Sequence, residues 1–436
     1  MLLRPFNWIS GIFIAAFLLS PIVADARQFG LKDVVPEILS FNAAVKNERP
    51  DLYRLKLRTM LADPFSFLRA TAHVMYRDIE QSPELEFLST SPQGLAGGDM
   101  HVHNFGVLYF PGKTPSYSPE DLDEARTAPL SYDLFRLCVS LAVAFEQFDQ
   151  GTLKGILVST IDGYREGLAH ANAPDWPDLS FPPKLRHFLK KVAATDKTAI
   201  LSKYTVAQIP NRFKKKDTFL KLSPQESDDV KSALMPFLLA KVRENHLPKD
   251  NATILDIIAR EDKGLSSIGL KRYQVLIEGR AGAWEDNRII EVKEMRPSCV
   301  KPTSLADQQK YTITALMRAH RDRDVFLGVV GIHGRPYLVR QLFSWSDRFD
   351  ASEWGERDTV ATMGRALGAI LADFHAPSKV STAMSGWLKD NIDATVTQSL
   401  RYALQVREDW GTAKRSLDRN AKSDVGKRHT GSSPSN

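Results

Sequence analysis

A glycine-rich run over residues 97–106 holds the side chains best suited to chemistry in this chain. It contains Asp99 and, five positions later, Asn104, and a second acidic group at 121–124 follows after a short segment. Phosphoryl transfer needs a carboxylate that orients or deprotonates the acceptor hydroxyl, and oxygen ligands that hold Mg²⁺ on the phosphates. We therefore expect Asp99 to act as the base, with Asn104 and Asp121 as metal ligands. A turn-forming role is the alternative for each of these residues.

Three further residues extend this group. We include His101 as a residue that orients the loop and Asp123 as a third metal ligand. His101 and His103 also allow a different interpretation, because residues two apart on a strand point to the same face. Two imidazoles on one face, completed by Asp99, Asp121 and Asp123, predict a metal-dependent hydrolase as an alternative.

A glycine-bearing turn and a strand lysine come later in the chain. The backbone amides of a turn that contains glycine can approach phosphates closely. Gly264, Ser266, Ser267 and Gly269 are therefore candidate nucleotide-binding residues. Lys293 lies in an apolar, alternating segment typical of a strand, where it would contact the same phosphates. A simple hairpin turn and a solvated lysine are the alternatives for these two features.

The sequence around these residues resembles, piece by piece and in order, the bacterial family called domain of unknown function 2252 (DUF2252). The resemblance extends from about Asp63 to Ser378 and rests on several short segments. Those segments are residues 63–69, 98–106, 121–125, 132–137, 264–269, 291–294, 339–342 and 371–376.

That family in turn resembles the aminoglycoside phosphotransferases and protein kinases. Those enzymes carry Gly-Asp-x-His-x-x-Asn, then an acidic loop, then an Asp-Leu pair on the next helix, and residues 98–104, 121–123 and 133–134 follow this order. In the present chain the glycine turn and Lys293 come after this loop, and the helix ending at His375 resembles the one that normally precedes it. The resemblance implies a circularly permuted, kinase-like α+β fold, with a small antiparallel sheet lobe and a larger helical lobe.

The same resemblance implies a phosphotransferase that uses Mg²⁺ and ATP or another nucleotide to phosphorylate an acceptor. In kinases a glutamate on the helix after the strand lysine pairs with that lysine. The helix expected over 305–320 offers only Asp307. A pseudokinase that binds a nucleotide or another ligand without transferring phosphate is therefore an alternative.

The first 26 residues have the pattern of an export signal. Arg4 gives a positive start, residues 9–23 are mostly apolar, and Ala24-Asp25-Ala26 offers small residues around a cleavage site. We expect a periplasmic or secreted protein, or one anchored to the inner membrane if this segment stays uncleaved. An exported kinase meets little ATP, so it would need another phosphoryl donor or scavenged nucleotide.

Composition and charge narrow the possible partners. The chain has 436 residues, of which 43% are hydrophobic and 25% charged, so it can bury a large core. Its net charge of +6 is uneven, with eleven Lys or Arg residues in 184–221. That segment is either a solvated surface or a surface for an anionic ligand, and its few aromatic residues argue against a nucleic-acid partner. Cys138 and Cys299 make no disulfide framework, and we expect them to be unpaired.

The expected organisation places helices before and after a small sheet. Residues 27–255 are expected to form the helical lobe with the catalytic loop, and 256–345 the β-rich lobe. Residues 346–411 are expected to return to the helical lobe, and 412–436 to form a disordered basic tail.

Apolar periodicity predicts the individual elements. A capping box at Ser223, followed by Pro224, marks the start of one helix that runs to about residue 245. Helices are also expected over 65–79, 134–148, 305–320 and 359–375, and strands over 273–278, 288–293, 325–330 and 336–342.

Overall fold

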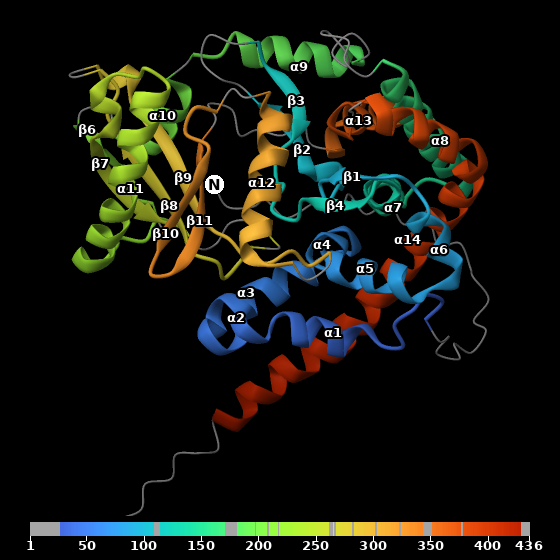
Figure 1. The fold of residues 1–436 in the computed structure, drawn as a ribbon. Helices are drawn as coiled ribbons and strands as arrows, with labels where there is room; N and C mark the ends of the chain where they lie inside the picture. The colour runs from blue at the N-terminus through green and yellow to red at the C-terminus, as the bar shows by residue number, and fades with distance from the viewer. Residues whose placement is uncertain are drawn as a thin grey trace, which may run out of the picture.

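The computed structural model describes most of the chain between residues 27 and 428. The stretches outside the description are 1–26, 109–113, 171–180, 197, 207–208, 217, 261–264, 266, 281–282, 301–302, 322–323, 343–350, 376–377 and 429–436. The fold is α+β, with helices in the larger part and small antiparallel sheets in the rest (Figure 1).

Short helices form the first layer of the described chain. They are α1 (Val34–Phe41), α2 (Ala43–Glu48), α3 (Pro50–Met60), α4 (Pro64–Ala70), α5 (Ala72–Gln81) and α6 (Glu86–Ser89). The single helix expected over 65–79 is wrong, because Thr71 has φ −122° and ψ 36° and separates α4 from α5. The hydroxyl of Thr71 donates to the carbonyl oxygen of Phe67 at 2.7 Å, which offers the backbone an alternative to a continuous helix.

Four longer helices make the core of the helical region. They are α7 (Ser131–Ala144), α8 (Gln150–Ala169), α13 (Arg357–His375) and α14 (Ser378–Arg428). A Cβ on Gly163 would come within 2.0 Å of the Arg365 carbonyl oxygen, so glycine lets α8 and α13 approach backbone to backbone. Cys138 and Cys299 are free thiols, as expected. Within the described ranges, every helix is too short or too polar to cross a membrane.

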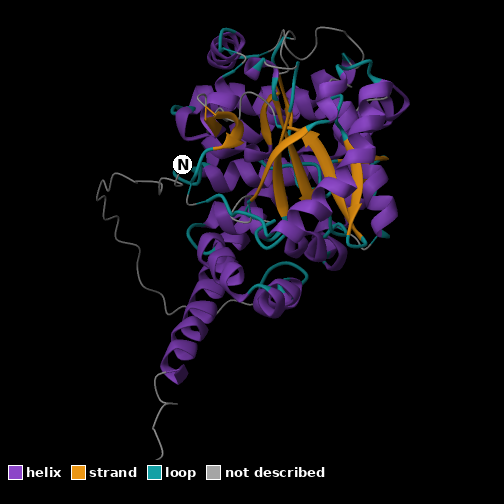
Figure 2. Cartoon of the chain, turned by 90° about the vertical axis from the view of Figure 1, so that its left-hand side faces the viewer, coloured by secondary structure: helices purple, strands orange, loops and turns teal. Residues whose placement is uncertain are grey.

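The last helix replaces much of the disordered tail that we expected over 412–436. α14 continues to Arg428, and Ala413 and Leu417 are buried in the same apolar cluster as side chains of α1 and α5. Residues four apart lie on one helix face, so these two apolar side chains extend the buried face of α14 into the basic stretch. Figure 2 shows this helix extending below the body of the molecule.

A five-stranded antiparallel sheet forms the second region. Its strands are β7 (Ile254–Ala259), β8 (Arg272–Ile277), β9 (Arg288–Glu294), β10 (Gly328–Ile332) and β11 (Arg335–Gln341), in the order β10-β11-β9-β8-β7. The two strands and the later hairpin that the sequence predicts are therefore confirmed. Alternation gives the sheet an apolar face, with Val275 and Ile290, and a second face that carries Gln274 and Glu291.

The apolar face of the sheet is covered by α11 (Pro224–Glu244). Ser223 caps this helix as expected, because its hydroxyl oxygen accepts a hydrogen bond from the Glu226 amide at 3.1 Å. Leu234 and Leu238 are fully buried against the sheet. α11 therefore belongs with the sheet region, although we expected residues 27–255 to belong to the helical lobe.

Part of the second face of the sheet is also covered by the chain itself. α10 (Ala199–Tyr204) and β6 (Ile209–Phe213), which pairs with β5 (Thr205–Val206), lie there. Leu201 and Phe213 pack against Leu276 and Ile289 of the sheet. The preceding helix α9 (Pro183–Ala193) lies at the top of Figure 1, between the sheet and the helical region.

Two small antiparallel sheets and one helix lie between the two regions. One sheet pairs β1 (Gln93–Ala96) with β4 (Arg126–Pro129), and the other is a hairpin of β2 (Phe105–Leu108) and β3 (Ser116–Pro119). The helix is α12 (Leu305–His320), whose expected bounds are confirmed. It lies between the five-stranded sheet and the β2–β3 hairpin (Figure 1).

Candidate functional site

The lysine that the sequence singles out reaches the acidic loop from the sheet. Lys293 lies on β9, on the same face as Glu291, and its side chain is 3% exposed. Its Nζ atom lies 3.3 Å from Oδ1 of Asp121 and also contacts the carboxylate of Asp123. Lys293 and Asp121 are 172 positions apart, so only the tertiary fold brings them together. Their expected closeness is confirmed.

Two amide side chains hold the acidic loop in place. Asn104 Nδ2 donates to the carbonyl oxygens of Asp99 (2.9 Å) and Asp121 (2.8 Å), and Asn104 Oδ1 accepts from the Asp121 amide (2.8 Å). Gln308 on α12 donates to the carbonyl oxygen of Asp123 at 2.6 Å. In this structure the side chain of Asn104 positions the acidic loop by bonding to the backbone of Asp99 and Asp121. Sequence reasoning named Asn104 for another role, as a metal ligand, and missed Gln308 entirely.

Asp99, the expected base, has one carboxylate oxygen fixed. Its Oδ1 atom accepts hydrogen bonds from Nε (2.9 Å) and Nη2 (2.7 Å) of the fully buried Arg136. Its Oδ2 atom lies 3.8 Å from Nε2 of His101. Burial raises the pKa of Asp99, although the charge and hydrogen bonds of Arg136 act against this. Arg136 therefore orients the carboxylate, and Oδ2 is the oxygen able to meet a substrate proton.

The two carboxylates around Lys293 differ in their acidity. Burial disfavours ionisation of Asp121, but Lys293, Arg340 and Arg272 outweigh burial and hold the pKa of Asp121 well below its usual range. Burial and the negative charge of Asp121 raise the pKa of Asp123, against the attraction of Lys293. Positive side chains of the sheet thus surround the carboxylates of Asp121 and Asp123. Two neighbouring carboxylates of this kind also suit a divalent cation.

Buried ion pairs across the sheet surround Lys293. Arg272 Nη1 lies 3.2 Å from Oε1 of Glu291, and Arg340 donates to Oε2 of Glu291 from Nε (3.0 Å) and Nη2 (2.9 Å). Arg340 also donates to the carbonyl oxygen of Glu120 at 2.9 Å, and Arg272 donates to the hydroxyl of Ser267 at 3.1 Å. Sequence reasoning missed these pairs, because alternating charges on separate strands meet only when the strand register is known.

The glycine turn between β7 and β8 is described in part, since Gly264 and Ser266 lie outside the described residues. Ser267 is bonded to the arginine of β8 and so lies next to the charged face of the sheet. Gly269 has φ +100°, which favours glycine, and a Cβ there would lie 2.6 Å from the side chain of Val45 on α2. The described end of the turn therefore packs against an N-terminal helix.

A buried aspartate on α7 supports the start of the Asp99 loop. Asp133 accepts hydrogen bonds from the amides of Gly97 (2.6 Å) and Gly98 (2.9 Å) and contacts Nε2 of His375 at 2.9 Å. The Nδ1 atom of His375 lies 2.7 Å from the hydroxyl oxygen of Tyr164. The end of α13 thus lies beside the loop, as we expected from the sequence.

The histidines of this loop do not form the metal site of the hydrolase alternative. His101 precedes a short 3-10 helix, η2 (Val102–Asn104), so it does not share a strand face with His103. The ring of His103 instead packs edge-on against Phe65, with centroids 4.8 Å apart. Across the described ranges, no three His, Cys, Asp or Glu side chains gather in a way that could hold a metal ion.

The acidic residue on α12 has a local role. The Ser304 hydroxyl donates to Oδ2 of Asp307 at 2.6 Å, and the Asp307 amide donates to the Ser304 hydroxyl oxygen at 3.1 Å. This reciprocal cap stabilises the start of α12. The carboxylates that contact Lys293 come from the acidic loop, and α12 supports that loop through Gln308.

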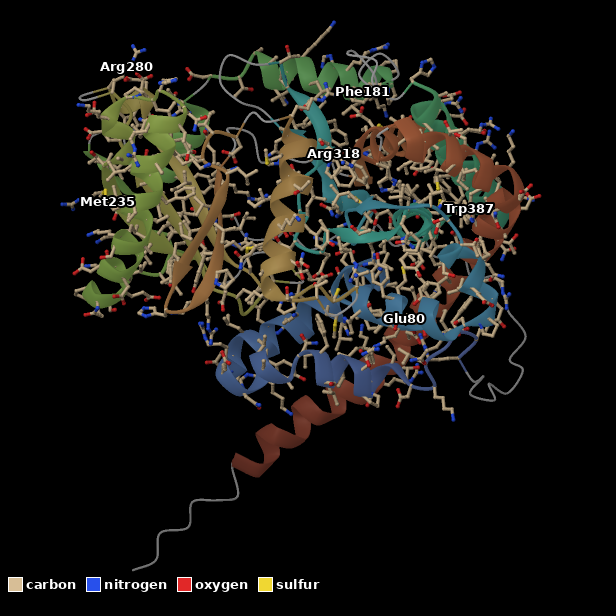
Figure 3. All side chains as sticks on the ribbon, viewed as in Figure 1. Glu80, Phe181, Met235, Arg280, Arg318 and Trp387 are labelled. Atoms are coloured by element: carbon tan, nitrogen blue, oxygen red, sulfur yellow. The ribbon has the colours of Figure 1, made fainter. Side chains whose placement is uncertain are left out.

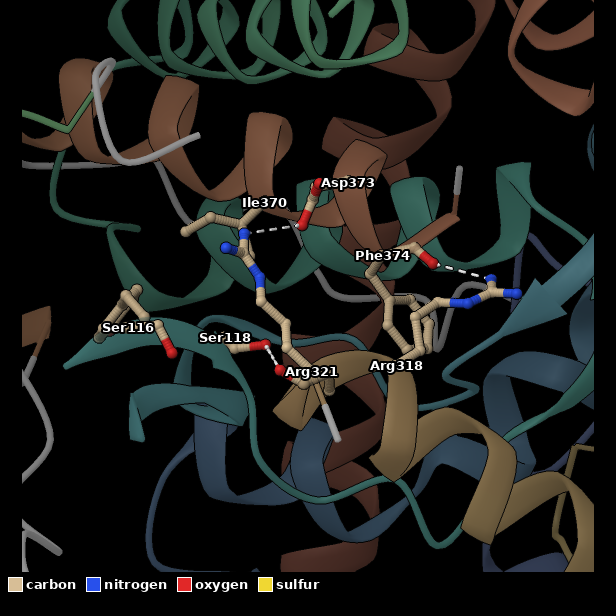
Figure 4. A pocket seen from close by; sticks show the side chains of 9 residues that line it. Ser116, Ser118, Arg318, Arg321, Ile370, Asp373 and Phe374 are labelled. Atoms are coloured by element: carbon tan, nitrogen blue, oxygen red, sulfur yellow. Dashed lines mark hydrogen bonds and ion pairs between the residues drawn. The ribbon is translucent and has the colours of Figure 1, made fainter. Parts of the chain in front are cut away.

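A pocket at the ends of α12 and α13 lies outside this group of residues. Arg318 and Arg321 line it together with Ser116, Asp373 and other side chains of β3 and α13 (Figure 4). Figure 3 marks the position of Arg318 in the whole molecule. Arg318 donates to the carbonyl oxygen of Phe374 at 3.0 Å, and Arg321 lies 3.5 Å from the carboxylate of Asp373. The pocket contains none of the candidate residues.

Comparison with known proteins identifies the family of the chain. Residues 48–415 match the family model described as "Uncharacterized protein conserved in bacteria (DUF2252)". Searches of curated proteins and of solved structures give no match. The match includes the Asp99 loop, the acidic loop, Lys293 and α13. The chain therefore belongs to the DUF2252 family.

Proposed function

We propose that this chain is a phosphotransferase, which moves a phosphoryl group from a magnesium-bound phosphoanhydride to an acceptor hydroxyl. The observation that carries the proposal is the contact of Lys293 with Asp121 and Asp123, on a loop that Asn104 ties to Asp99. In protein kinases the phosphate-binding lysine lies on the third strand, after a glycine-rich loop. Lys293 likewise lies on the third strand of its sheet in chain order, and the glycine turn lies between the first two strands.

The site supports a division of roles. Lys293 binds the phosphates of the donor, and Asp121 and Asp123 fit a cation because their carboxylates already converge on one ammonium group. Mg²⁺, when bound, neutralises charge on the phosphates. Asp99 orients the acceptor hydroxyl and takes its proton at Oδ2, while Arg136 and His101 position Asp99.

A pseudokinase on the same site is the second candidate. It is favoured by the two hydrogen bonds from Arg136 to Asp99, because the arginine opposes the rise in the pKa of Asp99 that burial causes and occupies one of its oxygens. Both candidates bind a phosphoanhydride with Mg²⁺. Only the phosphotransferase releases or transfers phosphate.

Thermal unfolding with and without magnesium and a nucleotide tests both candidates. Ligands that bind the folded state raise the melting temperature. We expect Mg²⁺ with ATP or tripolyphosphate to raise it in the natural protein. Lys293→Met and Asp121→Asn should lose this rise, whereas Lys310→Met, which changes an exposed lysine of α12, should keep it. If Mg²⁺ with ATP or tripolyphosphate still raises the melting temperature of Lys293→Met, the ligand does not bind at the proposed site.

We also propose that the chain is exported and cleaved after Ala26, as its first residues suggest. Arg27 would then be the first residue of the mature protein. Its guanidinium binds Asp78 (2.7 Å) and Asp409 (2.7 Å), so this residue is already held by α5 and α14. Mass spectrometry of the mature N-terminus tests the proposal. Cytosolic protein that begins at Met1 would contradict it.

A further inference from the structure

Arg272 lies beside Lys293 on the charged face of the sheet. The two residues are direct partners in the register of β8 and β9, so their side chains point to the same face. The Cβ atoms of such partners are about 4.5–5.5 Å apart. Although burial acts in the opposite direction, the positive charges around Asp121 lower its pKa, and Arg272 is one of them. A phosphate that binds Lys293 is therefore within reach of the Arg272 guanidinium as well.

The charged groups around Lys293 balance one another in this structure. Among the described side chains, ion pairs here link three cations to three carboxylates, which are Lys293, Arg272, Arg340, Asp121, Asp123 and Glu291. A magnesium-bound phosphoanhydride brings charges of both signs to this set. Its phosphate oxygens need the cations, and Mg²⁺ needs the carboxylates. Such a ligand therefore binds by exchanging partners within the set.

Arg272 holds its partners less firmly than the neighbouring Arg340. Its Nη1 atom donates one hydrogen bond to Oε1 of Glu291 at 3.2 Å, and its Nη2 atom donates to the Ser267 hydroxyl at 3.1 Å. Arg340 instead donates two hydrogen bonds to Oε2 of Glu291, at 3.0 and 2.9 Å. Paired and shorter bonds between an arginine and a carboxylate are the stronger ones. Glu291 therefore stays bound to Arg340 when Arg272 turns away.

Gln274 lies where it can replace Arg272 at Glu291. It is the direct partner of Glu291 in the register of β8 and β9, and it is fully buried. Neither its Oε1 atom nor its Nε2 atom has a hydrogen-bond partner among the described residues. An unpaired buried amide costs free energy. Because direct cross-strand partners are so close, rotation of the Gln274 side chain brings Nε2 to the Glu291 carboxylate without movement of the strands.

We propose that Arg272 is a second phosphate-binding residue of the site, and that Gln274 takes its place at Glu291 when the donor binds. This inference rests on the proposed phosphotransferase activity. Without a ligand, Arg272 is bonded to Oε1 of Glu291. When the donor binds, the side chains of Arg272 and Lys293 turn to its phosphate oxygens. Gln274 Nε2 then donates to the released Oε1 atom, while Arg340 keeps Oε2 of Glu291.

Calorimetric titration with tripolyphosphate in the presence of Mg²⁺ tests the role of Arg272. Arg272→Gln removes the positive charge, so it should bind tripolyphosphate at least about tenfold more weakly than the natural protein. Arg335→Gln is the matched control. Arg335 also pairs with a glutamate of β9, because its Nη1 atom lies 2.7 Å from Oε1 of Glu294. Glu294 follows Lys293 in the strand and belongs to the opposite face, so this variant should bind like the natural protein.

Gln274→Leu distinguishes a role in ligand binding from a role in folding. Leucine is similar in size and lacks the amide that is unpaired without a ligand. Removing an unpaired buried amide does not destabilise a protein, so the melting temperature without ligand should equal or exceed that of the natural protein. Affinity for tripolyphosphate with Mg²⁺ should fall about three- to tenfold, because the hydrogen bond to Glu291 can no longer form. A purely structural glutamine would give the opposite pair of results.

The outcomes separate this proposal from the phosphotransferase proposal. If Arg272→Gln binds tripolyphosphate as tightly as the natural protein while Lys293→Met loses it, the role of Arg272 is overturned and the proposed function stands. If Gln274→Leu melts at a lower temperature without ligand and keeps its affinity, the partner exchange is overturned. If Arg272→Gln does not fold, the result with Gln274→Leu decides. If tripolyphosphate does not bind the natural protein, or binds Lys293→Met equally well, both proposals fall.

Discussion

Asn104 and Asp121 bind each other in both directions. The Asn104 amide nitrogen donates to the Asp121 carbonyl oxygen, and the Asn104 oxygen accepts from the Asp121 amide, both at 2.8 Å. Because Asn104 also donates to the Asp99 carbonyl oxygen, one side chain fixes the expected base relative to the acidic loop. The Asp99 loop and the acidic loop are therefore already held together in the absence of a ligand.

Replacing Asn104 by Ala should weaken folding and the site together. Three hydrogen bonds to buried or half-buried backbone groups are lost, and leaving such groups unsatisfied costs about 1–3 kcal/mol in the free energy of unfolding. Urea unfolding measures this loss. Asn245→Ala is the control, because the exposed Asn245 donates only to carbonyl oxygens near the end of α11, and it should change stability by less than about 0.5 kcal/mol. Equal stability of the two variants would contradict the proposed role of Asn104.

Asp99→Asn should separate chemistry from binding. The asparagine oxygen can still accept from Arg136, so the loop keeps its shape, but the residue can no longer take a proton. Transfer of phosphate to an acceptor or to water should fall by at least about 100-fold, while donor affinity measured by calorimetry stays nearly unchanged. Full transfer by this variant would remove Asp99 from the role of base. A loss of donor binding would show a structural role instead.

Gly98→Ala should be strongly destabilising. Gly98 has φ +84°, and a Cβ there would lie 2.3 Å from the carbonyl oxygen of Glu124, so strain and a backbone clash combine. We expect a loss of about 2–4 kcal/mol in thermal or urea unfolding. Gly155→Ala is the matched control, because a Cβ on Gly155 meets nothing within 4 Å on α8. That change should stabilise the protein by about 0.5–1 kcal/mol.

His320 should make the protein less stable in acid. Burial, helped by the charge of Arg340, lowers the pKa of His320 from 6.5 to about 3. The unfolded chain therefore takes up this proton first as the pH falls. The stability that neutral His320 contributes is present above pH 6.5 and is lost as the pH falls from 6.5 to about 3, at up to ~1.4 kcal/mol per pH unit. His320→Gln should flatten this slope in urea unfolding between those pH values. His187→Gln, at an exposed position of α9, should not.

Local sequence signals predict the sheet and its neighbours well. The strands β8 and β9, the helix α12 and the capped start of α11 depend on alternation, apolar spacing and capping residues, which all act within a few positions. The break at Thr71 was missed because the apolar spacing continues through it. The burial of Ala413 and Leu417 was missed because the many charged residues of the last segment hid two apolar positions on one helix face.

The charged residues of the site show that a sequence pattern does not predict which side chains pair with one another. Lys293 and the acidic loop stood out by residue type and order. Arg136, Gln308 and the Arg272–Glu291–Arg340 pairs did not, because each acts on a partner that is distant in sequence. Such partners depend on strand register and on which surface a helix covers. An amphipathic helix such as α11 shows that it has a buried face, but not whether the sheet or the helical region covers that face.

The contact between Asp133 and His375 sets the order in which the molecule can be completed. The two residues are 242 positions apart, and α13 fills the apolar surface that α7 and α8 leave open. A ribosome therefore releases the Asp99 loop long before the helix that supports it exists. Until then this half of the chain holds exposed apolar surface without native partners. The apolar core that surrounds the Asp99 loop can therefore close only after residue 375 has been synthesised.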